Sequence, residues 1–425
     1  MILRPHMNSM SSSKLDAELA AYAATARTWL DSAAPRRDAA GQEASDSVAL
    51  FPEWDAVEPA ALLADARCWL RQRFDAGYSG IALPREVGGQ GLTHEHERVY
   101  EALEAEYVTP PPEIWNLGHH MVIPAIARFG TDVQRERFVL PGLRGDELFC
   151  QLFSEPNAGS DLASLRTRAE RAGDRWIVNG QKVWTSAAHV ADHGMLLCRT
   201  DPDAPKHRGI TCFIIPLDAP GVTIRPIRQI TGGSAFNEVF LDEVEVPDEL
   251  RLGELGGGWG ITRATLETER LSVPLNGPHG SPARLITLAQ RLGRAEDAAV
   301  RQRLADLAIR RTIADLTLER AHAAVRSGAG AGALASVLKL QTTELLTAMG
   351  ATAGEILGPR LVADTHEWGT WAWHRHVLES AGLRIGGGTD EIQRNVIAEA
   401  ALGLPREPSH AIIEPTGTPR QGGRP

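Results

Sequence analysis

The sequence predicts an α+β fold that is mostly α, with its strands confined to the middle of the chain. Ala, Leu, Glu and Arg dominate residues 16–148, where Pro and Gly interrupt a helical pattern. Short β-prone runs replace this pattern near Cys150, and amphipathic helical periodicity returns after residue 253. The expected domains are an N-terminal helical domain (1–148), a middle antiparallel β domain (149–252), a C-terminal helical domain (253–408) and a disordered tail rich in Pro, Gly and Thr (409–425).

The N-terminal domain has its clearest helix at THEHERVYEALEAEYV, residues 93–108. Thr93 can accept hydrogen bonds from the first backbone N–H groups, and acidic residues follow in the first turns. Residues 82–93, ALPREVGGQGLT, are rich in turn-forming residues. We therefore expect a connector there rather than a helix.

The middle domain is predicted to consist of short strands. In RWIVNGQKVWTS, residues 175–186, Asn179 and Gly180 separate two β-prone runs, which predicts a hairpin with a type I′ turn. The other expected strands are 194–200, 209–217, 222–227 and 236–247.

The C-terminal domain is predicted to contain long helices at 300–327, 337–358 and 390–405. The first of them is amphipathic, and its expected core-facing residues are Leu304, Leu307, Ile313 and Leu316. Thr389 or Asp390 begins the last helix, which ends at Gly403 and Pro405.

Composition disfavours several classes of function. A net charge of −10 and a pI of about 5.8 argue against a basic nucleic-acid surface, so an anionic ligand needs local donors. No apolar run reaches the length of a membrane span, and the first 14 residues lack the apolar core of a signal peptide, so we expect a cytoplasmic protein. No metal site is expected from the cysteine spacing, and buried reduced thiols are expected at Cys68, Cys150, Cys198 and Cys212.

Two segments of the middle domain carry groups suited to a cofactor. In QLFSEPNAGSDL, residues 151–162, the turn at 157–160 offers freed backbone N–H groups beside hydroxyls, a nest able to hold a pyrophosphate or a flavin edge. Trp184 and Ser186 offer a flat aromatic wall and a hydroxyl. Taken singly, the first is more often an ordinary turn, and the second is more often a core tryptophan beside a strand serine.

Together, FSEPNAGSD, NGQKVWTS and the C-terminal GGTDEIQRN resemble the acyl-CoA dehydrogenase family. The resemblance runs from residue 82 to residue 407. It implies an N-terminal helical domain, a middle β domain and a C-terminal four-helix bundle. It also implies FAD as the cofactor and an acyl-CoA thioester as the substrate.

The resemblance assigns roles to the matching positions. The backbone of residues 151–154 and the Ser154 hydroxyl would meet the flavin ring, while Gly159 and Ser160 would lie by the pyrophosphates of FAD and CoA. Trp184 would lean on the isoalloxazine, with Ser186 near its reactive nitrogen. The full set of implied FAD contacts is Gln151, Phe153, Ser154, Gly159, Ser160, Trp184, Ser186, Gly388, Thr389 and Glu391, the last three on the ribityl or adenine side.

The catalytic base departs from one family pattern and matches another. Many members carry the glutamate two residues before the threonine of the last motif, where this chain has Gly387. Another branch places it just before an arginine on the first helix of the C-terminal domain, and Glu269-Arg270 stands at that distance after GGGWG. The resemblance therefore implies Glu269 as the base, with Ser160, Glu267 and Arg270 on the substrate side.

Assembly departs from the family pattern as well. Family homotetramers hold the distal half of FAD with Arg-x-x-Phe-Gly and Gln-x-x-Gly-Gly-x-Gly segments, and neither is found between Ala283 and Gly382. Either FAD is held differently or a related partner chain supplies these contacts, so we expect a homo- or heterotetramer.

Pro274, Pro278 and Pro282 should interrupt the helix after Glu269, which suggests room for a bulky or branched acyl group, although a loop insertion fits equally.

The implied reaction is an α,β-dehydrogenation, in which a carboxylate removes the α-proton, a hydride passes to the flavin, and an electron-transfer flavoprotein reoxidises it. One alternative is a non-catalytic partner subunit of a heteromeric enzyme. Another is a flavin monooxygenase or nitroalkane oxidase of the same fold. A Rossmann-type NAD enzyme is disfavoured, because no G-x-G-x-x-G follows a strand and opens a helix.

Overall fold

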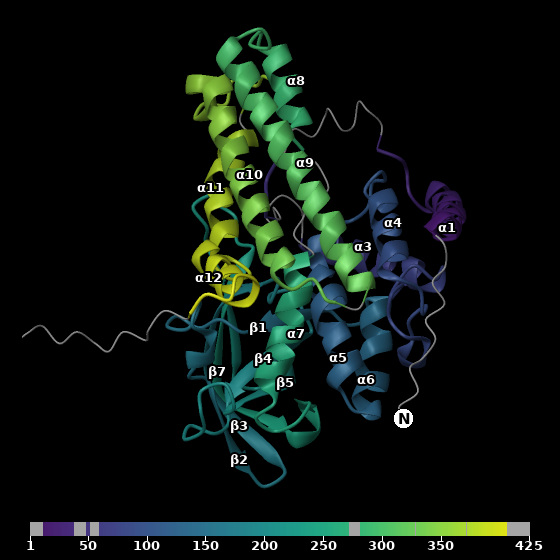
Figure 1. The fold of residues 1–425 in the computed structure, drawn as a ribbon. Helices are drawn as coiled ribbons and strands as arrows, with labels where there is room; N and C mark the ends of the chain where they lie inside the picture. The colour runs from purple at the N-terminus through teal and green to yellow at the C-terminus, as the bar shows by residue number, and fades with distance from the viewer. Residues whose placement is uncertain are drawn as a thin grey trace, which may run out of the picture.

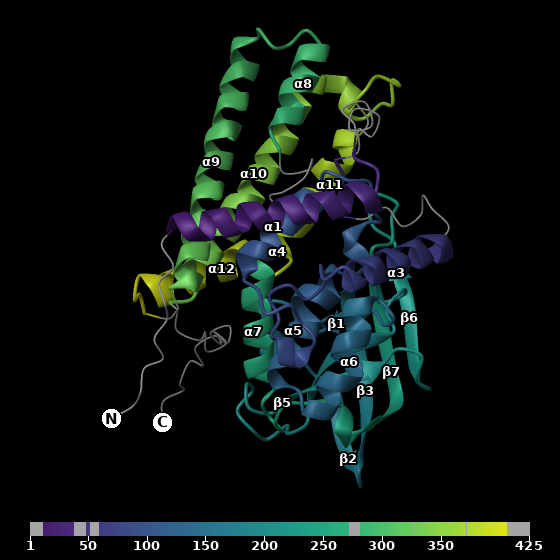
Figure 2. The same ribbon diagram turned by 90° about the vertical axis from the view of Figure 1, so that its right-hand side faces the viewer.

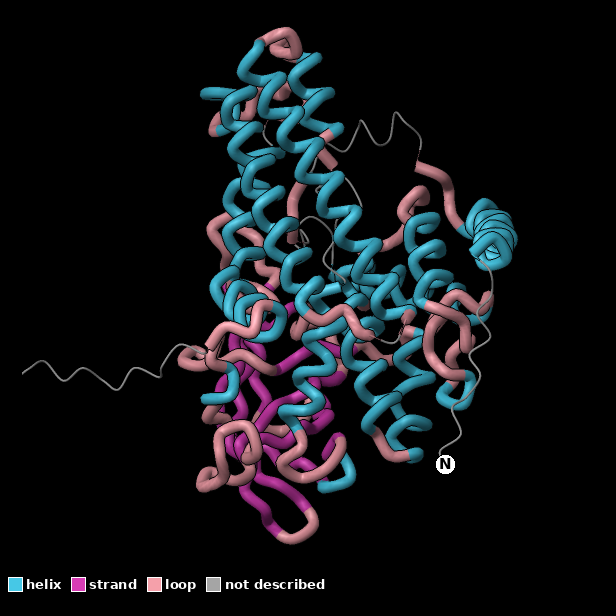
Figure 3. The backbone as a smooth tube through the Cα atoms, viewed as in Figure 1, coloured by secondary structure: helices cyan, strands magenta, loops and turns pink. Residues whose placement is uncertain are grey.

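The computed structural model describes residues 12–37, 48–51, 59–271, 281–327, 329–370 and 372–405. Its elements follow the order helices, sheet, helices, which confirms the predicted fold class. The C-terminal helices form an upright bundle above the sheet, with N-terminal helices alongside (Figure 1). The strands gather at one end of the molecule (Figure 3). The predicted disordered tail, 409–425, lies outside the described residues.

The N-terminal helices pack beside the sheet and the foot of the bundle. Their bounds are α1 (Ser12–Ala33), α3 (Pro59–Asp75), η2 (Arg85–Val87), α4 (His94–Glu104), η3 (Pro112–Ile114), η4 (Gly118–Val122), α5 (Ile123–Phe129) and α6 (Asp132–Arg144). Thr93 occupies the N-cap of α4 in an extended conformation, as predicted. Helix α1 lies across α4 (Figure 2).

The strands form one sheet in the order β6-β7-β3-β2-β4-β5-β8, with β1 pairing with β4 from the side. Their bounds are β1 (Phe149–Leu152), β2 (Arg168–Ala172), β3 (Arg175–Ser186), β4 (His193–Arg199), β5 (Ile210–Pro216), β6 (Val222–Ile227), β7 (Phe236–Pro247) and β8 (Arg251–Leu252). The sheet is mixed rather than purely antiparallel, because β1 runs parallel to β4. Strand β1 follows α6 after a short connection, so the chain enters the sheet at this parallel pair.

The predicted hairpin at Asn179-Gly180 is wrong. Strand β3 continues through both residues, and the turn that joins it to β2 lies at Gly173-Asp174. Gly180 has an extended backbone, and a Cβ there would lie 2.4 Å from Oγ1 of Thr167. Glycine is therefore needed at this position because Thr167 packs over it, and a dipeptide typical of turns is used here for close packing.

The C-terminal bundle is organised around one central helix, α10. The bounds of its elements are α7 (Gly258–Leu271), α8 (Ala283–Arg291), α9 (Ala298–Arg326), α10 (Ala333–Leu357), η8 (Gly358–Leu361), α11 (Ala372–Ile385), α12 (Asp390–Val396) and η9 (Ile397–Ala401). Helix α10 contacts α7, α8, α9, α11 and α12, and residues on all its sides are buried. Helix α7 ends at Leu271, three residues before Pro274, and Pro282 directly precedes α8.

The predicted core face of α9 is partly wrong. Leu307 is buried, but Ile313 and Leu316 are 47% and 54% exposed. Ala314 and Ala321 are buried instead, at intervals of seven residues from Leu307. Small residues allow α9 to approach α10 closely, so the larger side chains next to them point away.

Two further predictions concern the burial of the cysteines and the absence of membrane-spanning helices. Cys150, Cys198 and Cys212 are buried free thiols, as predicted, whereas Cys68 is exposed on α3. Burial raises the pKa of the three buried thiols. Among the described residues, no helix has the length and hydropathy needed to cross a membrane.

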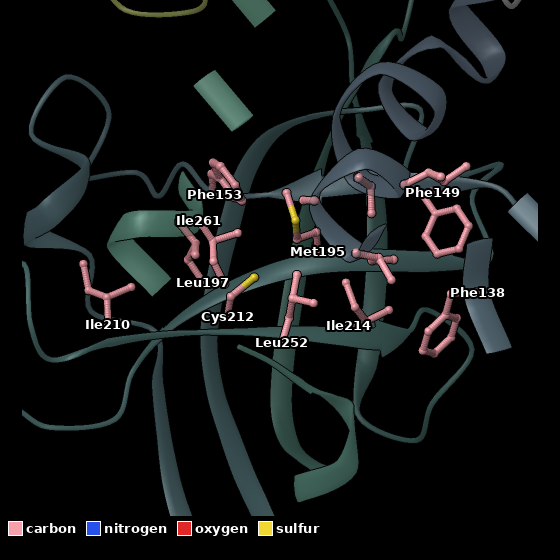
Figure 4. Packing of buried hydrophobic residues seen from close by; sticks show 14 of the residues in the cluster. Phe138, Phe149, Phe153, Met195, Leu197, Ile210, Cys212, Ile214, Leu252 and Ile261 are labelled. Carbon is pink, nitrogen blue, oxygen red and sulfur yellow. The ribbon is translucent and has the colours of Figure 1, made fainter. Parts of the chain in front are cut away.

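One apolar cluster joins the three parts of the chain next to the motifs. It includes Phe138 of α6, Phe149 of β1, Met195 of β4 and Ile261 of α7 (Figure 4). The N-terminal helices, the sheet and the first bundle helix therefore pack against one another in this cluster. Phe153, which follows β1, belongs to the same cluster.

Candidate active site

The two middle-domain motifs lie side by side. Strand β1 ends at Leu152, and the carbonyl oxygen of Ser154 accepts a hydrogen bond of 2.9 Å from the backbone N–H of Val183. The segment 151–154 therefore meets β3 immediately before Trp184. Phe153 is buried among core side chains, so only its backbone can face a ligand.

The loop after this segment exposes its apex. Glu155 and Ala158 exchange backbone hydrogen bonds of 3.1 Å, which closes a tight turn beneath the exposed residues Asn157, Gly159 and Ser160. A Cβ built on Gly159 would meet nothing within 4 Å. Backbone and hydroxyl groups at this apex can therefore reach a ligand.

Glu155 and Lys182 form a buried ion pair that the sequence reasoning missed. The Nζ atom of Lys182 lies 2.9 Å from Oε1 of Glu155. Burial acts to raise the pKa of Glu155, but Lys182 and the neighbouring N–H groups outweigh it and hold that pKa below its usual value. Burial lowers the pKa of Lys182, against the opposing charge of Glu155. Lys182 stands in NGQKVWTS next to residues that did attract attention, but no local pattern shows that it is buried.

Trp184 is an exposed aromatic residue on an unusual backbone. Its φ is 60° and its side chain is 58% exposed, at a register shift between β3 and β7. The left-handed region is disfavoured for a bulky residue and is often occupied at functional sites. The indole meets the ring of Phe236 edge-on at 6.1 Å. Next to it, the Thr185 hydroxyl is buried without a hydrogen-bond partner among the described residues.

A short segment, residues 48–51, connects this aromatic group with the bundle. Phe51 packs edge-on against Phe236 at 5.1 Å, and its ring would lie 3.2 Å from a Cβ at Gly382 on α11. The carboxylate of Glu379, also on α11, accepts the backbone N–H groups of Leu50 and Phe51. Sequence reasoning missed this connection, since nothing local pairs residues more than 300 positions apart.

The C-terminal motif is held by bundle residues. Gly387 and Gly388 have φ values of 64° and 89°, and the Thr389 hydroxyl caps α12 by accepting the N–H of Ile392. Both glycine carbonyls accept hydrogen bonds from the Gln393 side chain. Glu391 is exposed, as a residue in contact with a ligand would be.

Asp390 acts inside the bundle rather than on a ligand. It is 1% exposed, and its carboxylate lies 2.7 Å from Arg384 Nε and 3.3 Å from Lys339 Nζ. Burial acts to raise its pKa, but the hydrogen bond from Arg384 and the charge of Lys339 outweigh it, so the pKa lies below its usual range. Thr343 also donates to it, at 3.2 Å. This network fixes the start of α12 and the glycines before it.

The implied base lies on α7. Helix α7 contacts β5, α5, η4 and α10, so it runs between the sheet and the bundle. Glu267, Glu269 and Arg270 lie in its last turns, and their side chains are outside the described residues. Position 269 follows Thr262 by seven residues and therefore shares the helix face of the buried Thr262 and Thr265.

Three domain models of one family match consecutive parts of this chain. The N-terminal domain of acyl-CoA dehydrogenase matches residues 36–146, the middle domain 150–244 and the C-terminal domain 256–402. The chain belongs to the acyl-CoA dehydrogenase family.

Similar acyl-CoA dehydrogenases include two from Mycobacterium tuberculosis (strain ATCC 25618 / H37Rv). The chain is 39% identical to acyl-CoA dehydrogenase IpdE1 over 352 residues, covering 81% of this chain and 89% of IpdE1. It is 45% identical to acyl-CoA dehydrogenase FadE34 over 287 residues, covering 67% of this chain but only 39% of the length of FadE34. The solved Tcur3481-Tcur3483 steroid ACAD matches with a TM-score of 0.76 and 28% identity, covering 94% of this chain and all of that one.

Members of the acyl-CoA dehydrogenase family depend on FAD, and the described residues fit such a group. The exposed indole of Trp184 supplies a flat wall, and the unpartnered Thr185 hydroxyl lies next to it. The open apex at Gly159 leaves room for a bulky anionic group.

Proposed function

We propose that this chain catalyses the FAD-dependent α,β-dehydrogenation of an acyl-CoA thioester to the enoyl-CoA. The observation that carries the proposal is the exposed Trp184, held at a φ of 60° directly beside the segment that ends in Ser154. Backbone strain of this kind clusters at functional sites, and an exposed indole offers a flat apolar face on which a planar partner can stack. The family membership supplies the chemistry that such a partner serves.

When bound, FAD supplies the acceptor for the hydride that leaves the β-carbon. Residues 151–154 and Ser186 would contact the flavin ring through backbone groups and hydroxyls. Gly159 and Ser160 would lie by the pyrophosphates, and Gly388, Thr389 and Glu391 by the far side of the cofactor.

Glu269 would take the α-proton, whose acidity the thioester raises. Glu267 and Arg270, in the same turns of α7, would lie on the substrate side. Because α7 contacts both the sheet and the bundle, it can present a side chain to a substrate held between them. An electron-transfer flavoprotein would then remove the electrons from the enzyme.

A bulky acyl group is the proposed substrate class. Helix α7 ends at Leu271 and α8 begins at Ala283, and the sequence between them carries Pro274, Pro278 and Pro282, which disfavour a continuous helix. One similar solved structure is named as a steroid enzyme. Polycyclic or branched acyl-CoAs are therefore the first substrates to test.

The purified protein, expressed alone and with its partner, is expected to be yellow and to release FAD on denaturation. Anaerobic addition of a bulky acyl-CoA should bleach the flavin band, and mass spectrometry should find an acyl product two hydrogens lighter. If neither preparation holds flavin, the proposal is wrong. If flavin is present but substrate oxidation requires oxygen, the monooxygenase or oxidase alternative replaces it.

Two variants sharpen this experiment. Trp184→Ala removes the aromatic wall and should weaken FAD retention by roughly three- to tenfold, from the usual worth of one aromatic stack. Trp176→Phe changes a buried tryptophan on the same strand and should leave FAD affinity unchanged. Equal losses in both variants would point to general instability rather than to a flavin contact.

A related second chain is proposed as the partner, because the family's two distal FAD-holding segments have no counterpart between Ala283 and Gly382. The Tcur3481-Tcur3483 name joins two polypeptides, which supports this arrangement. Co-expression with an encoded neighbour of similar length should raise FAD content and activity per chain by roughly tenfold or more, the effect of about 1.4 kcal/mol of added binding. Size-exclusion chromatography with flavin absorbance measures both. A fully flavinylated, active homotetramer of this chain alone would rule the partner out.

A further inference from the structure

Lys182 is one of only four lysines in the chain, and its side chain is completely buried. We propose that Lys182 and Glu155 form a positioning device, which holds the loop 155–167 so that Gly159 and Ser160 face the pyrophosphate of the bound acyl-CoA. The inference rests on the proposed function and adds two positioning residues to it. Neither residue needs to touch the ligand.

One carboxylate joins the two ends of this loop. Glu155 accepts the backbone N–H of Arg166 at 2.6 Å and that of Thr167 at 2.8 Å, 11 and 12 positions further along the chain. Lys182 donates to the same carboxylate at 2.9 Å and to the carbonyl oxygen of Phe153 at 3.1 Å. Strand β3 thus supports the loop from beneath.

The part of the loop between these ends is exposed where a ligand would lie. Asn157, Gly159 and Ser160 face solvent, while Ala158 and Leu162 are buried. Arg199 of β4 holds the middle of the loop by donating to the carbonyl oxygen of Ala163 at 2.6 Å. A loop of this length has a considerable closure entropy, which the carboxylate offsets by fixing both ends.

An apolar pair of similar volume could fill the same space but could not accept the two N–H groups. The groups close to Lys182 include the buried thiols of Cys198 and Cys212. Buried ion pairs often add little net stability relative to such apolar replacements. The pair is therefore expected to affect the geometry of the loop more than the stability of the fold.

The first measurement is hydrogen exchange on the full-length protein without added ligand. In the double variant Glu155→Leu/Lys182→Met, the N–H groups of Arg166 and Thr167 lose their acceptor without leaving a buried charge. Exchange in the peptide that covers them should rise at least tenfold, while the melting temperature stays close to that of the wild type. Glu155→Gln/Lys182→Met keeps one acceptor without leaving a buried charge and should give a smaller rise, which tests the idea even if Glu155→Leu/Lys182→Met does not fold.

The second measurement compares an acyl-CoA with the corresponding acyl-pantetheine, which lacks the pyrophosphate. In both variants the KM for acyl-CoA should rise about tenfold with kcat within threefold of the wild type, whereas the KM for acyl-pantetheine should not change. Arg175 lies on β3, the strand of Lys182, and forms a surface ion pair with Glu245 of β7. Arg175→Met breaks this pair, is the matched control and should change neither value.

Unchanged exchange at Arg166 and Thr167 in Glu155→Gln/Lys182→Met overturns the inference, as does an equal KM increase for both substrates. A failure of the proposed function gives a different result. In that case the wild type would neither bind flavin nor oxidise any acyl-CoA, but the exchange measurement would still decide whether the pair holds the loop.

Discussion

Glu269→Gln is expected to slow the anaerobic bleaching of the flavin by acyl-CoA by roughly 10²–10⁴-fold, the usual effect of losing a general base. Glutamine preserves the size of the side chain but removes the basic oxygen. FAD content and acyl-CoA binding should therefore survive. Stopped-flow absorbance of the flavin band under saturating substrate measures the rate.

Glu254→Gln, in the exposed turn before α7, is the control for this variant and should react at the wild-type rate. Bleaching of Glu269→Gln at the wild-type rate would eliminate Glu269 as the base. Moving the carboxylate to Gly387 in the Glu269→Gln background should rescue poorly. Gly387 has a φ of 64°, and the left-handed region costs other residues about 1–2 kcal/mol.

Asp390→Asn is expected to lower the free energy of unfolding by about 3–5 kcal/mol, the range for breaking a buried ion pair from one side. The variant leaves the ammonium of Lys339 in the bundle core without its carboxylate. It also replaces one of the two acceptor oxygens by an NH2 group, so the hydrogen bonds from Arg384, Lys339 and Thr343 cannot all be kept. Thermal and urea denaturation, followed by circular dichroism, measure the loss.

The pH dependence of stability tests the direction of the pKa shift of Asp390. The pKa of Asp390 is lowered in the folded state, so its contribution is present above its unfolded pKa of about 4 and is lost as the pH falls through the folded value. The stability difference between wild type and Asp390→Asn should therefore shrink as the pH drops below about 4. Asp306→Asn, which breaks an exposed pair with Arg310, should cost no more than about 1 kcal/mol at any pH. A difference that grows on acidification would contradict the assignment.

Much of the fold could be predicted because it depends on local patterns. The strands at 194–200, 209–217, 222–227 and 236–247 lie within a residue or two of β4, β5, β6 and β7. The caps at Thr93 and Thr389 also hold, since capping needs only the residues of one turn.

The errors arose where a residue serves a distant contact. Gly180 is not in a turn but within β3, where Thr167, the residue before β2, packs against it. Ile313 and Leu316 are exposed because small residues of α9 make the contact with α10. Local hydrophobicity and turn propensity cannot distinguish these cases from the common ones.

In the candidate site, too, the local motifs could be predicted and the contacts between distant residues could not. The order of three motifs in the sequence was enough to indicate the family, and the structure joins Ser154 to Val183, the residue before Trp184. Glu155, Lys182 and Phe51 were missed, because a charge becomes a buried partner only when strands or segments far apart in sequence meet.

The sequence by itself determined the order of helices and strands, the family and the residue types available for flavin chemistry. These follow from periodicity, composition and short motifs, which are properties of neighbours along the chain. Only the tertiary structure decided which charged groups are buried and what they hold in place. The Glu155–Lys182 pair is shielded from water only when the whole sheet has packed around it. The Asp390–Lys339 pair is likewise shielded only when the whole bundle has formed.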